Sequence, residues 1–275
     1  MNINTMRITI FGAGNIGGAI ARGLVAAGLL PADAITLTRR SAEHLQVFEK
    51  QGFTVTVDNR AATTRSELLI LAVTPQQLNG LLDEVRDLLD ATRHILVSVV
   101  SGASIAAIRA RTDRNIPIVR AMPNTAVALR ESMTCLSAGP DAAPQLALVD
   151  TLFKGLGHTV VISEELMVPA TALCACGIAF FLRAIRAASQ GGIEIGFHAE
   201  DALLMAAQTA KGAATLLVEV GNHPESEVDR VTTPQGCTIS GLNQMEHNGF
   251  SSAMIKGIVT AASKAAVLYA PKTEA

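Results

Sequence analysis

Short apolar, β-branched runs alternate with amphipathic stretches along the N-terminal half of the chain. The runs at 68–73 and 94–99 are apolar almost throughout, which is typical of strands covered on both faces. Regular alternation of this kind predicts an α/β fold built on a parallel, doubly wound sheet. The predicted strands are 7–11, 34–38, 52–55, 68–73, 94–99 and 116–120, with helices at 19–27, 42–51 and 76–89. Pro117 lacks a backbone donor, so its strand is expected at an edge of the sheet.

Beyond about residue 164 the pattern changes, because strand-like runs disappear and Ala, Gly and Leu recur at helical spacing. We therefore predict two domains, 1–163 and 164–275, of which the second is helical. Its long helices are predicted at 169–190, 198–220 and 250–269, with a loop at 231–240 that leads into a further helix. The uncharged stretch 166–182 nearly has the length of a membrane-spanning helix, but Pro169 and Gly177 favour a buried helix.

The amino-acid composition limits the kinds of molecule that the chain is expected to bind. The 22 basic and 24 acidic residues leave a net charge of -2, which gives no electrostatic basis for binding nucleic acid or an anionic membrane. Aromatic residues make up 3% of the chain, too few for a base-stacking groove or a sugar-binding platform. Hydrophobic residues reach 49% against 17% charged, so apolar surface is expected to be buried between subunits.

The four cysteines show no spacing typical of a metal site, and Cys174 and Cys176, two residues apart, cannot share a helix face. We predict reduced thiols in a cytoplasmic protein without a bound metal. The short polar start of the chain does not resemble a secretory signal.

Residues 12–17 form a complete Gly-x-Gly-x-x-Gly sequence directly after the first predicted strand and at the start of a helix. A dinucleotide-binding loop requires this context, whereas the pattern alone also occurs in ordinary glycine turns. The first glycine permits a tight turn, the second lets the backbone approach a pyrophosphate, and the third lets the helix pack on the strand. The predicted cofactor contacts in this loop are Gly12, Gly14, Asn15, Ile16 and Gly17.

The end of the second predicted strand indicates which nicotinamide cofactor is bound. An NAD-binding protein usually has an acidic residue there, but this chain has Arg39 and Arg40. Two guanidinium groups suit a 2′-phosphate, so NADPH is predicted, with NADH as the weaker cofactor. The alternative, a solvated basic helix start, is disfavoured by the helix dipole. Ligands bind at the carboxyl ends of parallel strands, so the residues after the fourth strand are also predicted cofactor contacts: Ala72, Val73, Thr74 and Pro75.

Several segments together resemble the pyrroline-5-carboxylate reductase family, in matching order and spacing over essentially the whole chain. They are Gly12–Gly17, Ala72–Pro75, Arg120–Thr125, Leu152–Gly157, Val231–Ile239 and Leu242–Phe250. The resemblance implies an oxidoreductase acting on a C=N bond. Hydride passes from NADPH to the imine carbon of pyrroline-5-carboxylate and yields proline, a step of proline biosynthesis. The resemblance also implies a Rossmann-like N-terminal domain, a C-terminal all-helical dimerisation domain, and a dimer or larger homo-oligomer.

The family also implies roles for residues outside the glycine loop. Met122, Pro123 and Asn124 are expected to reach the nicotinamide end of the cofactor. Asn59 is expected on the adenosine side, and a helix N-cap is its alternative role. The substrate-binding residues implied by the family are Thr233, Gly236, Cys237 and Thr238.

The chemistry of the loop at 233–238 agrees with a role in substrate binding. A cyclic imine that arrives protonated needs no strong general acid from the protein. Backbone N–H groups of the loop precede a helix and can hold the substrate carboxylate. The hydroxyl of Thr238 can hydrogen-bond the ring nitrogen, which makes Thr238 the predicted catalytic residue.

The sequence departs from the family pattern near the predicted contacts. Thr74 stands where the family has lysine, and Gln235 replaces the first of two loop glycines. Cys174 and Cys176 replace serines, and the run at 175–180 lacks the family's proline. These changes leave two alternatives open: a reductase of another cyclic imine or of a hydroxyacid, and an NADPH-binding protein that has lost catalysis.

Overall fold

The computed structural model describes residues 3–269. It divides into two compact units, which are described separately. The first comprises the residues up to Cys176 together with those from Ala261 onward, and the second is Gly177–Thr260.

The first unit contains one sheet, which has eight strands among the described residues, in the order β3-β2-β1-β4-β5-β6-β7-β8. The strands are β1 (Ile8–Phe11), β2 (Ile35–Thr38), β3 (Thr54–Thr56), β4 (Leu68–Leu71), β5 (Ile95–Ser98), β6 (Ile118–Met122), β7 (Ser132–Ala138) and β8 (Gly157–Val161). All neighbouring strands are parallel except β6 and β7. The order 3-2-1-4-5-6 is that of a doubly wound dinucleotide-binding sheet, so the predicted α/β fold class is confirmed.

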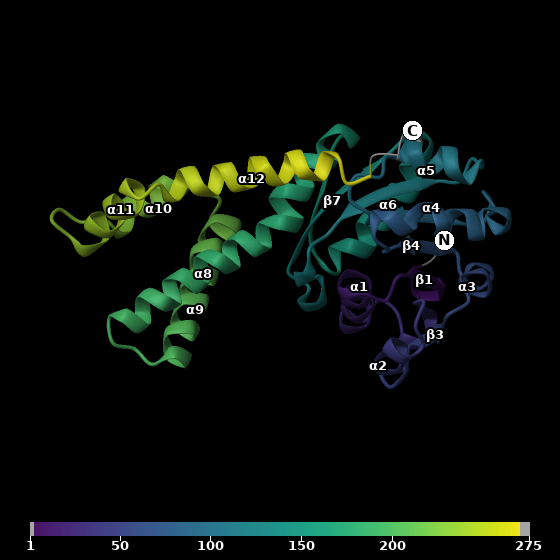
Figure 1. Ribbon diagram of the computed structural model, residues 1–275, viewed down its shortest axis with the longest axis horizontal. Helices are drawn as coiled ribbons and strands as arrows, with labels where there is room; N and C mark the ends of the chain where they lie inside the picture. Colours follow the sequence, from purple (N-terminus) through teal and green to yellow (C-terminus); the bar gives the residue numbers. More distant parts are fainter. Residues whose placement is uncertain (1–2, 270–275) are drawn as a thin grey trace. The chain divides into compact units, whose positions relative to one another are not determined.

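Helices cover both faces of this sheet (Figure 1), and the alternation along each strand explains why. Ile10 of β1 and Ile70 of β4 point into the core under α1 (Asn15–Ala26) and α6 (Ala143–Lys154), whereas Phe11 and Leu71 point into the opposite core. That second core lies under α3 (Asn59–Arg65), α4 (Pro75–Val85) and α5 (Ile105–Thr112). The shorter helices are α2 (Gln46–Glu49) and the 3-10 turns η1 (Ile3–Thr5), η2 (Ala32–Ala34), η3 (Glu43–Leu45), η4 (Arg86–Leu88), η5 (Thr125–Leu129), η6 (Pro140–Ala142) and η7 (Glu164–Leu166).

Two strand predictions need correction. Pro117 does not mark an edge, because β6 lies between β5 and β7. Pro117 immediately precedes β6, so its missing N–H falls outside the ladder, while its carbonyl still accepts from Leu96 N–H at 3.0 Å. Strands β7 and β8 were not predicted, and β7 makes the sheet mixed rather than wholly parallel.

The second unit is helical, as predicted. It contains α8 (Gly177–Glu194), α9 (Ala199–Val220), α10 (Pro224–Val231), α11 (Cys237–His247) and the first part of α12 (Phe250–Ala266). Helices α8 and α9 pack closely, since a Cβ at Gly192 would lie 3.0 Å from the Cβ of Ala202. No strand follows β8 in the part of the chain that the structure describes.

The division between the units differs from the predicted boundary at 163/164, because the segment just beyond it packs on the sheet. This segment is α7 (Met167–Ala170), followed by the π-helical η8 (Thr171–Cys176). Met167 and Ala170 form a small core with Met122 and Cys135 of β6 and β7. At the other end, the last part of α12 and the residues up to Tyr269 belong to the first unit, where Tyr269 donates its hydroxyl to Asn79 Oδ1 at 2.6 Å.

The stretch 166–182 is not the buried helix that its sequence predicted. Leu173, Phe181 and Leu182 are 56%, 60% and 59% exposed in the single chain. By length and composition alone, the helical stretches Glu164–Glu194 and Ala199–Val220 are both long and apolar enough to cross a membrane. The start of the first stretch packs on the sheet through Met167 and Ala170, but most large apolar side chains of both stretches lack a cover within the described part of one chain.

Candidate functional site

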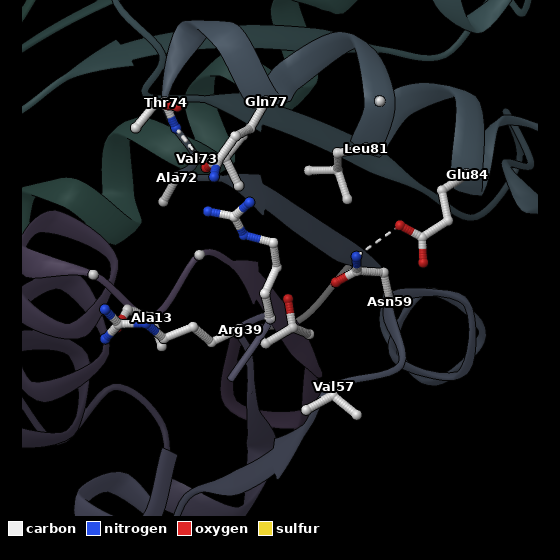
Figure 2. A pocket seen from close by; sticks show the side chains of 15 residues that line it. Ala13, Arg39, Val57, Asn59, Ala72, Val73, Thr74, Gln77, Leu81 and Glu84 are labelled. Atoms are coloured by element: carbon white, nitrogen blue, oxygen red, sulfur yellow. Dashed lines mark hydrogen bonds between the residues drawn. The ribbon is translucent and has the colours of Figure 1, made fainter. Parts of the chain in front are cut away.

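A cavity of about 510 Å³ lies at the carboxyl ends of β1, β2 and β4, where the strand order reverses. Such a switch point is the usual ligand site of an open α/β sheet. The cavity is lined by Gly12, Ala13, Gly14, Thr38, Arg39, Arg40, Val57, Asn59, Ala72, Val73, Thr74, Gln77, Gly80, Leu81 and Glu84 (Figure 2). It thus brings together predicted contacts from four separate segments of sequence.

The glycine loop is shaped by steric requirements at its two ends. Gly12 has φ +101, and a Cβ there would lie 2.5 Å from the carbonyl oxygen of Ala72. A Cβ at Gly17 would lie 2.2 Å from the carbonyl oxygen of Gly12. The N–H groups of Gly12 and Ala13 both donate to Thr38 O, at 3.1 and 2.8 Å. These contacts hold the loop against β4 and the end of β2.

The middle of the loop is open. A Cβ at Gly14 would meet no atom within 4 Å, and Gly14 is the N-cap of α1 without a side-chain cap. The first turn of α1 contains no acidic residue, so its free N–H groups and positive dipole end remain available to an anion. This arrangement fits a pyrophosphate.

The two arginines after β2 have different surroundings. Arg39 is half-buried and its Nη1 donates to the carbonyl oxygen of Ala13 at 3.1 Å, whereas Arg40 is exposed. Both line the cavity. They place two positive charges at its rim, which fits the charge of a 2′-phosphate.

Asn59 of α3 and Glu84 of α4 form a hydrogen-bonded pair in the wall of the cavity. Asn59 Nδ2 donates to Glu84 Oε2 at 2.8 Å, and Figure 2 shows the carboxamide oxygen of Asn59 pointing toward the cavity. The alternative role of Asn59 as an N-cap is wrong, because Asp58 caps α3 by accepting from Ala61 N–H at 2.9 Å. Asn59 is instead the first residue of α3, with its side chain turned to the cavity.

The segment after β4 forms the floor of the cavity. Ala72, Val73 and Thr74 line it, and Thr74 N–H donates to Gln77 Oε1 at 3.4 Å (Figure 2). Pro75 is the first residue of α4 and does not line the cavity. Its fixed φ and missing donor suit the start of a helix, so its contribution is to begin α4 at this point.

Some residues that line the cavity were not predicted from the sequence. Val57, Gln77, Gly80, Leu81 and Glu84 come from the β3–α3 connection and from one face of α4. The period of α4 predicts an amphipathic helix, but not that its exposed turn borders a ligand. Nothing in the local sequence around Val57 distinguishes it from other loop residues.

Several predicted cofactor contacts lie outside the cavity. Asn15 lines a neighbouring hollow together with Arg39, and Ile16 packs against the core under α1. Met122 and Pro123 are buried at the end of β6. Asn124 uses its side chain internally: Oδ1 accepts from Ala126 N–H at 3.0 Å, and Nδ2 donates to Cys174 O at 3.4 Å. Contact of these residues with the nicotinamide stays a prediction.

The predicted substrate residues belong to the second unit, at the start of α11. Gly236 N–H donates to Thr233 O at 2.9 Å, which closes a tight turn, and Gly236 is the N-cap of α11. The helix begins at Cys237, so the loop is shorter than the predicted 231–240, and Thr238 lies in the first helical turn with an exposed side chain. No acidic residue occupies this turn, and its N–H groups have no helical acceptors.

The backbone conformation of Gln235 explains why the family pattern has a glycine at this position. Its φ is 59, in the left-handed region that favours glycine.

Across residues 3–269, there is no cluster of three or more His, Cys, Asp or Glu side chains that could hold a metal ion.

Two family models match the chain. Residues 164–268 match pyrroline-5-carboxylate reductase dimerisation, from the position where the sequence pattern changes. Residues 7–102, which hold the glycine loop and the cavity, match NADP oxidoreductase, coenzyme F420-dependent.

Named relatives cover nearly the whole chain. Pyrroline-5-carboxylate reductase 2 of Dictyostelium discoideum is 50% identical over 95% of this chain and 92% of its own length. Pyrroline-5-carboxylate reductase 1 of the same organism is 54% identical over 97% of this chain, which spans 50% of that relative's length. The solved structure of a pyrroline-5-carboxylate reductase from Coxiella burnetii is 30% identical and has a TM-score of 0.86, covering 98% of this chain and 100% of that one. These similarities confirm the resemblance read from the sequence: the chain belongs to the pyrroline-5-carboxylate reductase family.

Proposed function

We propose that this chain is an NADPH-dependent reductase that transfers hydride to the imine carbon of pyrroline-5-carboxylate and so produces proline. The cavity at the sheet switch point carries this proposal. It joins an open glycine loop, a free helix N-terminus and two arginines in a chain of the reductase family. The named activity of the relatives supports the choice of substrate.

The residues that line the cavity suit the chemical groups of NADPH. The open backbone at Gly14 suits the pyrophosphate, and Arg39 and Arg40 suit the 2′-phosphate. Val57 and Leu81 offer apolar surface for the adenine, beside the Asn59 carboxamide. When bound, NADPH supplies the hydride for the reaction.

The substrate loop provides binding and orientation. N–H groups at the start of α11 hold the carboxylate, and the Thr238 hydroxyl accepts a hydrogen bond from the protonated ring nitrogen. The C=N bond gains hydride at carbon, and its electron pair moves to nitrogen, which keeps its proton. The protein therefore needs to position the imine and exclude water, and no side chain has to deliver a proton.

The same family membership supports proposals about assembly and location. We propose a homo-oligomer built through the dimerisation segment, without a nucleic acid or membrane partner. Four free cysteines support a reducing compartment, and we place the protein in the cytoplasm.

NADPH oxidation by the purified chain tests the proposed reaction. Pyrroline-5-carboxylate, its six-membered analogue and a 2-keto acid are compared at equal concentration, and proline is identified as the product. We expect the five-membered imine to give the highest kcat/KM. Faster reduction of either other compound would overturn the substrate assignment, and NADPH binding without turnover would favour a protein that has lost catalysis.

A further inference from the structure

One of the two cysteines that replace the family's serines, Cys174, has a partner distant in the sequence. Cys174 lies in η8, and its sulfur is 3.8 Å from the sulfur of Cys135, in the middle of β7. Both thiols are free. They belong to the small core of Met122, Met167 and Ala170, where β6 and β7 meet the segment leading to α8.

We propose that Cys135 and Cys174 form an intramolecular disulfide when a peroxide oxidises the protein, and that this bond is reversed by a dithiol. A disulfide requires a sulfur separation of about 2.05 Å, so the two sulfurs must approach by roughly 1.8 Å from 3.8 Å. No other residue needs to be displaced from between them, because they are already in contact.

The two thiols differ in the properties that peroxide chemistry requires. Cys174 is half-buried, and the hydrogen bond from Cys135 lowers its pKa to about 7. Cys135 is buried, and the same interaction together with burial raises its pKa. A partly accessible thiolate beside a buried thiol matches the arrangement of an attacking and a resolving cysteine.

Oxidation to the disulfide takes two steps. The Cys174 thiolate attacks one oxygen of hydrogen peroxide, the O–O bond breaks, and a sulfenic acid and one water are produced after proton uptake. The Cys135 sulfur then displaces the sulfenic hydroxyl as a second water and forms the S–S bond. Two thiols lose two electrons in total, and one peroxide molecule gains them.

The position of the pair links it to the proposed function. The Cys174 carbonyl accepts from Asn124 Nδ2, and the other end of that carboxamide caps η5. Movement of η8 toward β7 therefore acts on the loop predicted to reach the nicotinamide. Resting on the proposed reductase activity, we expect oxidation to lower kcat by roughly 10-fold, because small displacements near reacting groups have large effects on rate.

Peptide mapping after treatment with hydrogen peroxide tests the bond directly and without reference to activity. Remaining thiols are alkylated, and the protein is digested without reductant. We expect a linked peptide containing Cys135 and Cys174, free Cys176 and Cys237, and loss of the link after dithiothreitol. Cys174→Ser and Cys135→Ala should abolish the link. Cys176→Ser, two residues from Cys174, is the matched control and should keep it.

A mapping result with Cys135 and Cys174 both alkylated, or with Cys174 converted to sulfinic acid without a link, would overturn the disulfide. Activity is measured on the same samples. If the link forms while kcat stays unchanged, the coupling to Asn124 is wrong, although the disulfide stands. If the reduced protein shows no turnover, the proposed function fails, and the mapping still decides whether the bond forms.

Discussion

Arg39 and Arg40 are neighbours in sequence, but the structure gives them different surroundings. Arg39 is held against Ala13 of the glycine loop, whereas Arg40 is exposed at the rim of the cavity. Loss of Arg40 should therefore affect only the proposed contact with the 2′-phosphate, and loss of Arg39 should also loosen the glycine loop. Single substitutions of the two arginines can therefore test the proposed 2′-phosphate contact separately from the proposed pyrophosphate site.

We expect Arg40→Ala to weaken NADPH binding by about 1.5–3 kcal/mol, roughly 10- to 100-fold, and to leave NADH binding unchanged. Arg39→Ala should weaken both cofactors. Fluorescence titration with each dinucleotide measures the effect. Arg86→Ala, an exposed arginine that does not line the cavity, serves as the control. Equal NADPH affinity of the parent and the Arg40 variant would show that the phosphate lies elsewhere.

Thr238 allows a test of substrate binding that is independent of the cofactor. Thr238→Val keeps the shape of the side chain and removes its hydroxyl. We expect kcat/KM for pyrroline-5-carboxylate to fall roughly 10- to 100-fold, as for a hydrogen bond to a charged group worth about 1.5–3 kcal/mol. NADPH affinity should stay unchanged. Thr215→Val, on an exposed position of α9, is the matched control. Turnover at the parent rate in the Thr238 variant would place the ring nitrogen at another group.

At the scale of elements, the β1–α1 junction contains two glycines with opposite roles. Gly17→Ala forces a Cβ against the backbone oxygen of Gly12, so it should destabilise the fold by about 1–3 kcal/mol, as overpacking does. Gly14→Ala meets only open space, so stability should change by less than about 0.5 kcal/mol. The added methyl group would instead occupy the proposed position of the pyrophosphate, so we expect NADPH affinity to drop. Urea unfolding and NADPH titration of both variants distinguish packing from ligand approach.

Glu164 and Arg120 tie η7 to β6 through an ion pair that is buried on one side. Arg120 is 3% exposed, and its Nη1 lies 3.3 Å from Glu164 Oε1, which also accepts from Ile105 N–H at 2.6 Å. Burial lowers the pKa of Arg120, and its Nε and Nη2 find no further partner among the described residues. The guanidinium therefore depends on Glu164 for its counter-charge.

We expect Glu164→Gln to destabilise the protein by about 2 kcal/mol, because it leaves Arg120 charged, buried and unpaired. Arg120→Met should cost less, since it removes the buried charge and leaves a carboxylate that is one-third exposed. Urea denaturation measures the free energy of unfolding of the two variants and shows which substitution is more destabilising. A larger loss in Arg120→Met would mean that packing of the arginine stem, rather than its charge, holds η7 in place.

The elements also show which features the sequence could predict. β4 and β5 were found because both of their faces are apolar. β7 and β8 were missed because small and polar residues interrupt them, and β8 is largely exposed. In the site, the glycines and arginines have local signals, since turn geometry and charge are properties of the sequence. Val57 and Glu84 have none, because they reach the cavity only through the packing of α3 and α4.

At the scale of the whole molecule, the helical unit exposes large apolar side chains that no described part of the single chain covers. Leu204 and Val218 of α9 and Ile255 of α12 are 69%, 61% and 61% exposed, and Ala202 is the buried residue of α9. Large apolar side chains exposed in such number are unfavourable in water. Of these two helices, α9 also has the length and composition of a membrane span, and both lie within the residues that match the dimerisation family model. We therefore expect a second copy of the chain to cover these side chains.

We expect a stable dimer or larger assembly at low micromolar concentration, with at least about 2,000 Å² buried per interface, as in obligate homodimers. Leu204→Glu places a charge on the apolar face and should shift the protein toward a less soluble monomer. Leu129→Glu is the matched control, because Leu129 is 78% exposed but lies in η5 of the first unit. Light scattering after size exclusion gives the mass of each variant. A parent protein that elutes as a stable 28.7 kDa monomer would contradict assembly through these helices. The parent and the Leu129 variant should instead share one larger mass.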